Sequence, residues 1–241
     1  MGQRILKDPP PVEGFFILNT RRCVLFLNGL IYDYSFLHSF LNATDVLIAV
    51  DGGLKHLAAA DLNAEILIGD LDSVPLEDLH LAEQLGVEIL RFPVEKDETD
   101  FELALELAVQ RNFDPIVIVG GLGGRLDHTL GNIFLLANPK FSKNHIRFED
   151  GQEEVFMIDS SAEISGEPGD RVSLLPISDC AVGVQTEGLQ YQLCRETLEF
   201  EKTRGISNVM LSKNARVTLD SGHLLCIHTH TRQIDSWENK S

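Results

Sequence analysis

Residues 22–150 alternate between short apolar runs and segments with helical periodicity. Continuous apolar runs are typical of strands covered on both faces, and strand–helix alternation builds parallel sheets through right-handed crossovers. We expect strands at 22–28, 45–50, 64–68, 87–92, 115–120 and 145–150, and helices at 33–42, 53–60, 75–85, 99–112 and 127–137. The pattern predicts an α/β N-terminal domain, residues 15–150, with a Rossmann-like, mostly parallel sheet.

The pattern changes after residue 150. Short apolar runs now follow one another between Gly, Pro, Ser, Asn and Asp, without a helical segment of useful length, at 154–159, 171–176, 180–186, 191–194, 215–220 and 223–230. Closely spaced short strands with turn residues between them are typical of sandwiches and barrels. We therefore expect an all-β C-terminal sandwich domain over residues 151–241. Residues 1–14, which include three consecutive prolines, are expected to form an extended lead-in outside the core.

Charge and cysteine content limit the partners and the compartment. The formal net charge of -17 repels nucleic acid and anionic membrane surfaces, so neither is expected as a partner. No run of apolar residues is long enough to span a membrane. The four cysteines form no CxxC pair, and the N-terminus has no signal-peptide pattern. We therefore expect reduced thiols and a cytoplasmic location.

Aspartates are concentrated in three short motifs: GDLDS at 69–73, KDETD at 96–100 and GGRLD at 123–127. Each motif follows an apolar run, and ligands of open α/β sheets bind beyond the carboxyl ends of the strands. A cluster of carboxylates repels itself unless a cation lies within it, and hard oxygen ligands suit Mg²⁺ held together with phosphate oxygens. The motifs therefore favour a metal–phosphate site built on Asp70, Asp72, Asp97, Asp100 and Asp127.

The same motifs also have purely structural interpretations. GDLDS is compatible with an Asx turn in which Asp72 caps the next helix. In KDETD, Thr99 and Glu102 match a capping box, which accounts for acidic residues at a helix start. Lys96 either neutralises the acidic cluster, contacts a phosphate or is solvated.

A glycine-rich segment, GGLGGRLDHTLGN at 120–132, joins an expected strand to an expected helix. Glycines let backbone N–H groups approach phosphate oxygens, and Arg125 offers a planar fork of donors. The spacing matches neither the P-loop nor the dinucleotide-binding fingerprint. A tight strand-to-helix turn is the alternative interpretation.

Two histidines, His228 and His230, fall on one face of an expected strand near the end of the chain. A metal site is one interpretation of this pattern. Surface pairing is the more common role of an isolated HxH, and it is the favoured interpretation here.

Taken in order, the segments DGG, GDLDS, KDETDFELAL, GGLGGRLDHTLGN, VSLLP, TEGLQYQL and GISN resemble the thiamine pyrophosphokinase family. The resemblance covers roughly residues 22–230. It implies an α/β catalytic domain, a β-sandwich domain for thiamine binding and dimerisation, and a homodimer. It also implies transfer of diphosphate from ATP to the hydroxyl of thiamine, with Mg²⁺ as cofactor and AMP as the second product.

The resemblance also implies roles for individual residues. Metal would be bound by Asp70, Asp72 and Asp100. Support, or acceptance of the hydroxyl proton, would fall to Asp97 or Asp127. The nucleotide would contact Asp51, Gly52, Gly53, Lys96, Gly121, Gly123, Gly124, Arg125, Asp127, His128 and Asn132. Thiamine would contact Tyr191, Ser207 and Asn208, with Tyr191 at a position where the family often has tryptophan.

Two other functions are compatible with the sequence. One is a related diphosphokinase that acts on another hydroxymethyl heterocycle, such as a pterin, in which case residues 191, 207 and 208 would discriminate. The other is a non-catalytic nucleotide or thiamine sensor, against which the complete set of carboxylates argues.

Overall fold

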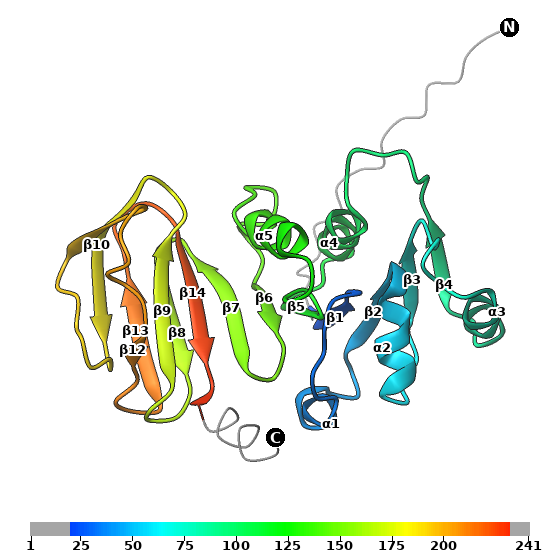
Figure 1. Cartoon of the computed structure of the whole chain (residues 1–241), viewed down its shortest axis with the longest axis horizontal. Coiled ribbons are helices and arrows are strands. Elements are labelled where there is room, and N and C mark those ends of the chain that lie inside the picture. Colours follow the sequence, from blue (N-terminus) through cyan, green and yellow to red (C-terminus); the bar gives the residue numbers. More distant parts are fainter. Residues whose placement is uncertain (1–19, 232–241) are drawn as a thin grey trace, which may run out of the picture.

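The structure is a computed structural model that describes residues 20–231 (Figure 1). The strands are β1 (Cys23–Phe26), β2 (Val46–Val50), β3 (Ile66–Gly69), β4 (Glu88–Arg91), β5 (Ile116–Val119), β6 (Ile146–Glu149), β7 (Glu153–Ile158), β8 (Ser161–Ser165), β9 (Arg171–Pro176), β10 (Cys180–Glu187), β11 (Glu196–Glu199), β12 (Asn208–Val209), β13 (Asn214–Thr218) and β14 (Leu224–Thr229). The helices are α1 (Ser35–Phe40), α2 (Leu54–Ala59), α3 (Leu76–Gln84), α4 (Asp100–Gln110) and α5 (Leu126–Leu135), and a 3₁₀ turn, η1 (Asp51–Gly53), precedes α2.

A ten-stranded sheet runs through the described part of the molecule in the order β12-β9-β14-β7-β6-β5-β1-β2-β3-β4. The six neighbouring strands β6, β5, β1, β2, β3 and β4 are all parallel to one another. The pairs of β6 with β7, β7 with β14, β14 with β9 and β9 with β12 are antiparallel. The predicted mostly parallel sheet is therefore confirmed for the N-terminal part.

The parallel half is apolar on both faces. Cys23 and Leu25 of β1 pack in one buried cluster with side chains of α4, and Val24 and Phe26 pack in another with side chains of α1 and α2. Coverage on both faces explains why these strands are continuously apolar. Thr99 is confirmed as the N-cap of α4, because its Oγ1 atom accepts a hydrogen bond from the backbone N–H of Glu102.

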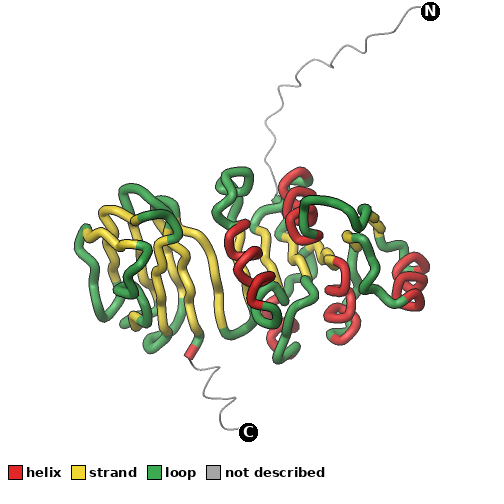
Figure 2. Tube along the Cα trace, turned by 45° about the horizontal axis from the view of Figure 1, so that its top comes forward, coloured by secondary structure: helices red, strands yellow, loops and turns green. Residues whose placement is uncertain are grey.

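The C-terminal part is a β-sandwich. A second sheet, in the order β11-β10-β13-β8, packs against the antiparallel half of the large sheet. Val172 and Leu224 of the large sheet share a buried cluster with Val184 and Val217 of the small one. Figure 2 shows the helices gathered around the parallel half, whereas the other half consists of strands and loops. The predicted sandwich is therefore confirmed.

One predicted strand is wrong. Residues 191–194 form a loop, and the neighbouring strand, β11, begins only at Glu196. Side chains take over the backbone hydrogen bonds here: Asn208 accepts from the N–H of Tyr191, and Thr186 accepts from the N–H of Leu193. Arg195, with φ of 56°, then breaks the extended conformation. The short or polar strands β8, β11 and β12 were missed.

The division into domains at residue 150 stays a prediction. The chain turns at 150–152 between β6 and β7, where the sheet changes from parallel to antiparallel. The same sheet continues across this turn, and Val155 and Leu225 pack in the apolar cluster of the parallel half. The strands β7 and β14 therefore contribute side chains both to this cluster and to the core of the sandwich.

Three further expectations concern the termini, the membrane and the cysteines. The predicted lead-in at residues 1–14 lies outside the described residues. Within residues 20–231, no helix has the length and apolarity needed to cross a membrane. The cysteines are free: Cys23 and Cys226 are buried, Cys180 is partly buried and Cys194 is exposed.

Candidate active site

A pocket with a volume of about 830 Å³ opens at the carboxyl edge of the parallel strands. From β1 the sheet extends in one direction to β2, β3 and β4, and in the other to β5 and β6. Ligands of doubly wound sheets bind where the strand order reverses in this way. The loops that leave the two neighbouring strands run to opposite sides there and leave a crevice between them. The lining comes from the segments that follow β1, β2 and β5 and from the starts of α4 and α5.

Three aspartates meet at this edge. Asp51 follows β2, Asp70 follows β3, and Asp100 is the first residue of α4. One carboxylate oxygen from each lies within 4.8 Å of the others. Gly69 permits this approach, because a Cβ atom at this position would lie 3.0 Å from the Cβ of Asp51. Asp51 itself has a φ of 47°, which is uncommon for a non-glycine residue and is often associated with functional sites.

Lys96 supplies the positive charge next to this cluster. Its Nζ atom lies 2.9 Å from Oδ1 of Asp100 and 3.8 Å from Oδ2 of Asp70. Oδ1 of Asp51 is nonetheless buried without a hydrogen bond, whereas the contact to Lys96 satisfies Oδ1 of Asp100. Buried carboxylate oxygens that lack donors are costly unless a cation coordinates them. The donor set, three carboxylates with lone pairs to spare, fits a hard divalent cation such as Mg²⁺.

The other predicted carboxylates lie outside this cluster. Asp72 is exposed, and its backbone N–H donates to Oδ1 of Asp70 across Leu71, which has a φ of 64°. The Asx turn is thus confirmed, but Asp70 makes it; capping of α3 by Asp72 is wrong, because no side chain caps that helix. Asp97 is exposed, and Asp127 pairs with Arg125. Whether Asp72 binds metal stays a prediction.

The glycine-rich loop lies beside the aspartates. The carbonyl of Gly120, at the start of this loop, accepts a hydrogen bond of 2.9 Å from the N–H of Gly29. This bond holds the ends of β1 and β5 together. Asn132 of α5 donates from Nδ2 to the carbonyl of Gly121 at 2.9 Å. The loop is therefore fixed by backbone and side-chain contacts at the mouth of the pocket.

Arg125 is largely exposed and forms two hydrogen bonds to Asp127, of 3.2 and 2.6 Å. This guanidinium lowers the pKa of Asp127, so the carboxylate is ionised. The predicted nucleotide-binding residues that line the pocket are Asp51, Lys96, Gly121, Gly123, Gly124, Arg125, Asp127, His128 and Asn132. Gly52 and Gly53 are buried in η1, outside the lining.

His56 contributes to the site although the sequence interpretation omitted it. The side chain is buried, and Nε2 lies 2.9 Å from the carbonyl oxygen of Gly29 while Nδ1 lies 2.7 Å from the hydroxyl of Tyr34. A carbonyl accepts only, so Nε2 carries the proton and Nδ1 accepts from the hydroxyl. Burial and the charge of Lys55 lower the pKa of His56, which keeps it neutral. A histidine among the apolar residues of α2, next to Lys55, was the available signal.

The predicted thiamine-binding residues meet at the opposite edge of the large sheet. Tyr191 and Asn208 exchange hydrogen bonds: Oδ1 of Asn208 accepts from the N–H of Tyr191 at 2.9 Å, and its Nδ2 donates to the carbonyl of Tyr191 at 2.7 Å. Ser207 precedes β12 and donates its N–H to Oγ of Ser173. The tyrosine ring is exposed.

Comparison with known proteins agrees with this arrangement. Residues 37–148 match the model of the thiamin pyrophosphokinase catalytic domain, and residues 158–224 match that of the thiamin pyrophosphokinase vitamin B1 binding domain. The thiamine pyrophosphokinase of Bacillus subtilis is 30% identical over 184 residues, which cover 76% of this chain and 86% of the relative. Thiamin pyrophosphokinase 1 of Caenorhabditis elegans is 24% identical over 221 residues, 83% of each chain.

Solved structures show the same likeness. The crystal structure of the Bacillus subtilis thiamine pyrophosphokinase superimposes with a TM-score of 0.78 at 27% identity, covering 87% of this chain and 99% of that one. The thiamin pyrophosphokinase of Candida albicans has the same fold, with a TM-score of 0.76 at 19% identity over 88% of this chain and 90% of that one. On the strength of both family models and of the Bacillus relative, this chain belongs to the thiamin pyrophosphokinase family.

Proposed function

We propose that the protein transfers the diphosphoryl group of ATP to the hydroxyl of thiamine and releases AMP. The observation that carries this proposal is the meeting of Asp51, Asp70 and Asp100 at the point where the strand order reverses. Asp51 and Asp100 of this cluster line the pocket, together with the glycine-rich loop. The match of residues 158–224 to a vitamin B1 binding domain supports thiamine over a pterin as the acceptor.

The carboxylate cluster would hold Mg²⁺. Asp51, Asp70 and Asp100 would be the ligands, with Asp72 next to them when the nucleotide is bound. The ion would neutralise charge on the phosphate oxygens and orient them. The buried Oδ1 atom of Asp51, which accepts no hydrogen bond, supports this assignment.

The remaining groups of the pocket would position ATP. Lys96 would turn from the carboxylates toward a phosphate, and backbone N–H groups of the loop at 121–124 would approach phosphate oxygens. Arg125 would exchange Asp127 for a phosphate oxygen. Its side chain is 72% exposed, so this exchange requires no repacking. These contacts would hold the β-phosphorus in line with the attacking hydroxyl.

One carboxylate would accept the proton of that hydroxyl. Asp127 and Asp97 are both exposed and near the start of a helix. Asp127 lines the pocket, whereas Asp97 does not. The departure of Arg125 to a phosphate would remove the charge that lowers the pKa of Asp127. We therefore favour Asp127 as the base.

The acceptor would reach this pocket from a second chain. Tyr191 and Asn208 lie beside β12, six strand positions from β1, a separation of roughly 29 Å at about 4.8 Å per strand. One thiamine molecule cannot bridge that distance within a chain. The exposed Leu126, Leu130 and Phe134 of α5 give an apolar face for a partner near the pocket. Both observations support a homodimer.

The chain would work as two parts that share one sheet. Residues 15–150 would bind nucleotide and metal, and residues 151–241 would bind thiamine and form the dimer. The four free cysteines support a cytoplasmic location.

Product analysis tests the function. Incubation of the purified protein with ATP, Mg²⁺ and thiamine is expected to give AMP and thiamine diphosphate in equal amounts, measured by anion-exchange chromatography. Formation of ADP with thiamine monophosphate would indicate a simple kinase and contradict the proposal. A pterin alcohol in place of thiamine is expected to give no product.

A further inference from the structure

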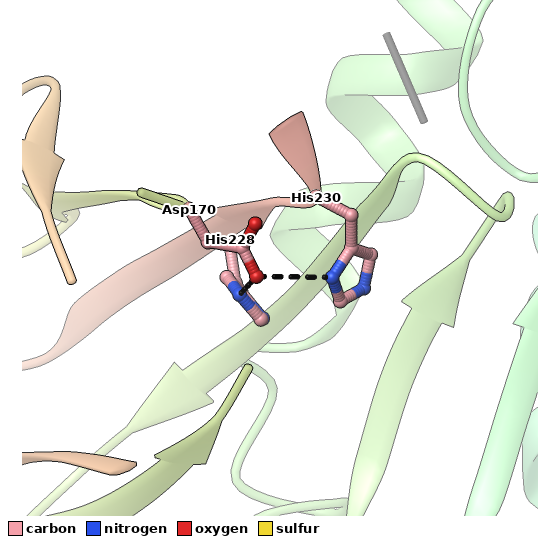
Figure 3. Close-up of side chains that lie close together, drawn as sticks. All are labelled: Asp170, His228 and His230. Carbon is pink, nitrogen blue, oxygen red and sulfur yellow. Dashed lines mark hydrogen bonds and ion pairs between the residues drawn. The ribbon is translucent and has the colours of Figure 1, made fainter. Parts of the chain in front are cut away.

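A second group of metal-binding side chains lies far from the active-site pocket, where β14 ends. It consists of Asp170, His228 and His230, whose ligand atoms all lie within 4.8 Å of one another (Figure 3). Asp170 and His228 are buried, and the side chain of His230 is 29% exposed. The favoured surface interpretation of the HxH motif is therefore wrong for His228.

The spacing of these atoms is that of ligands around an ion. Oδ2 of Asp170 lies 3.3 Å from Nε2 of His228 and 3.6 Å from Nδ1 of His230. The first contact is a long hydrogen bond and the second is beyond hydrogen-bond distance, whereas ordinary N–H···O bonds centre near about 2.9 Å. Tetrahedral coordination with bonds of about 2.0–2.2 Å separates neighbouring ligand atoms by roughly 3.3–3.6 Å. Figure 3 shows the carboxylate oxygen between the two ring nitrogens.

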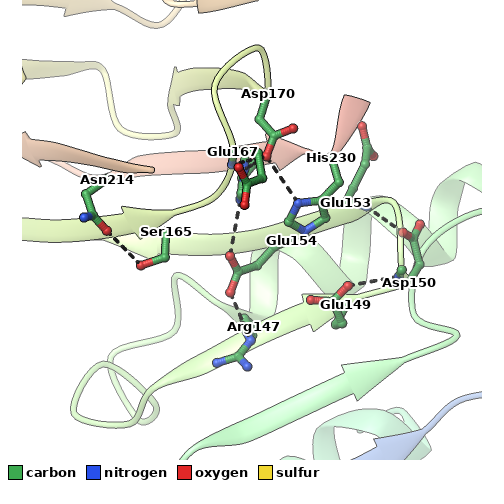
Figure 4. A network of polar contacts seen from close by, with 12 residues as sticks. Arg147, Glu149, Asp150, Glu153, Glu154, Ser165, Glu167, Asp170, Asn214 and His230 are labelled. Carbon is green, nitrogen blue, oxygen red and sulfur yellow. Dashed lines mark hydrogen bonds and ion pairs between the residues drawn. The ribbon is translucent and has the colours of Figure 1, made fainter. Parts of the chain in front are cut away.

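A second carboxylate, that of Glu154, lies near the other ring nitrogen of His228. Oε2 of Glu154 lies 3.7 Å from Nδ1 of His228, and that nitrogen is buried without a hydrogen bond. Oε1 of Glu154 faces Nε of Arg147 at 3.0 Å (Figure 4). Metal-binding histidines typically direct their other nitrogen at a carboxylate, which fixes the ring and raises its basicity. Glu154 occupies that position.

Hydrogen bonds and close packing fix the surroundings of this cluster. The N–H groups of Glu167 and Thr231 donate to the carboxylate of Asp170, at 2.8 and 3.1 Å. A Cβ atom at Gly166 would lie 2.7 Å from both Oδ2 of Asp170 and Nε2 of His228. The cluster therefore packs against the backbone of Gly166, and only its His230 side is partly exposed to solvent.

We propose that Asp170, His228 and His230 bind one zinc-class divalent ion, separate from the magnesium site. Two imidazole nitrogens and one carboxylate are the donor set that suits Zn²⁺ rather than Mg²⁺. The ion would join the end of β14 to the turn between β8 and β9. It would do so in the half of the molecule that carries Tyr191 and Asn208, with a fourth position left for water.

Zinc binding by the whole protein tests this proposal. The chain is treated with a chelator, dialysed and titrated with Zn²⁺ against a chromophoric competitor, in excess Mg²⁺ and at mildly alkaline pH. Alkaline pH is chosen because both imidazoles must be deprotonated to bind metal. We expect one zinc per chain, and cobalt substitution is expected to give the visible absorption of a tetrahedral site without a thiolate band.

Variants identify the ligands. His230→Ala and Asp170→Asn are expected to weaken zinc binding at least about 100-fold, and Glu154→Gln by about 10–100-fold, since it removes only the supporting carboxylate. His223→Ala is the matched control, because His223 forms an isolated exposed pair with Asp159 at 2.7 Å. It is expected to bind zinc as the unmodified chain does.

Several results would overturn the proposal: no stoichiometric zinc in the unmodified chain, a thiolate band with cobalt, or equal affinity in His230→Ala and His223→Ala. Circular dichroism without zinc shows whether each variant is folded. If His230→Ala does not fold, the isosteric Asp170→Asn variant still tests the site. Asp51→Asn is expected to bind zinc normally, so this result is independent of the proposed diphosphoryl transfer.

Discussion

At the scale of single residues, the active site depends on charges that are incompletely paired. Asp51, Asp70 and Asp100 approach one another at the edge of the sheet, and only Lys96 forms an ion pair within the cluster. Unpaired carboxylates destabilise the folded protein, and a bound cation would offset this unfavourable free energy. The stability cost and the proposed catalytic gain therefore have the same source.

Asp72→Asn is expected to lower turnover at least about 100-fold without changing the fold, because a carboxylate beside the metal and phosphates supplies several kcal/mol to the transition state. Initial rates with Mg²⁺ as the only divalent metal measure this. Asp61→Asn is the control, since Asp61 is also an exposed aspartate but lies in the turn after α2, outside the carboxylate cluster. Near-normal turnover in Asp72→Asn would remove Asp72 from the metal site.

Arg125→Ala is expected to raise the KM for ATP by about 10-fold or more and to leave the KM for thiamine within about 2-fold, because a phosphate-binding guanidinium is worth about 1.5–3 kcal/mol. Steady-state kinetics with each substrate varied in turn measure the two constants. Arg195→Ala, which breaks an exposed pair with Asp220, is the control. Equal changes in both constants would contradict the phosphate role.

Residue types and spacing were enough to find Asp70, Asp100 and the loop at 120–124. They were not enough to group Asp51 with Asp70 and Asp100, because that contact depends on how β2 and β3 end side by side. His56 was missed for a similar reason: its partners, Tyr34 and Gly29, come from other segments.

At the scale of elements, the turn between β6 and β7 joins the two halves of the large sheet. Glu149, the last residue of β6, is half-buried there and accepts a hydrogen bond from the N–H of Gly151. Burial raises its pKa from 4.5 to about 7, and the neighbouring Glu154 adds to the effect. The folded chain thus keeps a proton that the unfolded chain releases near pH 4.5, so folded-state stability falls as pH rises from about 4.5 to 7.

Glu149→Gln is expected to remove this dependence, because glutamine is neutral at every pH. The free energy of unfolding of the variant should equal that of the unmodified chain near pH 4.5. It should exceed it by about 3 kcal/mol above pH 7, from a shift of about 2.5 pH units. Urea unfolding over this range measures the difference, with the exposed Glu163→Gln as control. A difference that does not vary with pH would contradict the assigned burial.

Periodicity predicted the elements of the parallel half because both faces of its strands are buried and leave a strong apolar signal. The same signal is weak at β8 and β12, which are polar or only two residues long. The loop at 191–194 was misassigned because its backbone binds the side chains of Thr186 and Asn208, which lie outside the segment, instead of a neighbouring strand.

At the scale of the whole molecule, the sheet separates the two proposed binding functions. The carboxylate cluster lies at the parallel end, and Tyr191 with Asn208 lies at the antiparallel end. The sequence predicted both folds but not that one sheet joins them, because pairing of β6 with β7 depends on a turn rather than on composition. That separation is the structural reason to expect an assembly of two chains.

The rate of thiamine diphosphate formation by Asp100→Asn, relative to the unmodified chain, tests the central claim most directly. Asparagine keeps the shape of the side chain and removes its charge, so circular dichroism should not change. We expect the rate with ATP, Mg²⁺ and thiamine to fall at least about 100-fold, a loss of roughly 3 kcal/mol of transition-state stabilisation. A folded Asp100→Asn protein that forms thiamine diphosphate within about 2-fold of the normal rate, well under 1 kcal/mol, would contradict the assignment of this cluster as the catalytic metal site.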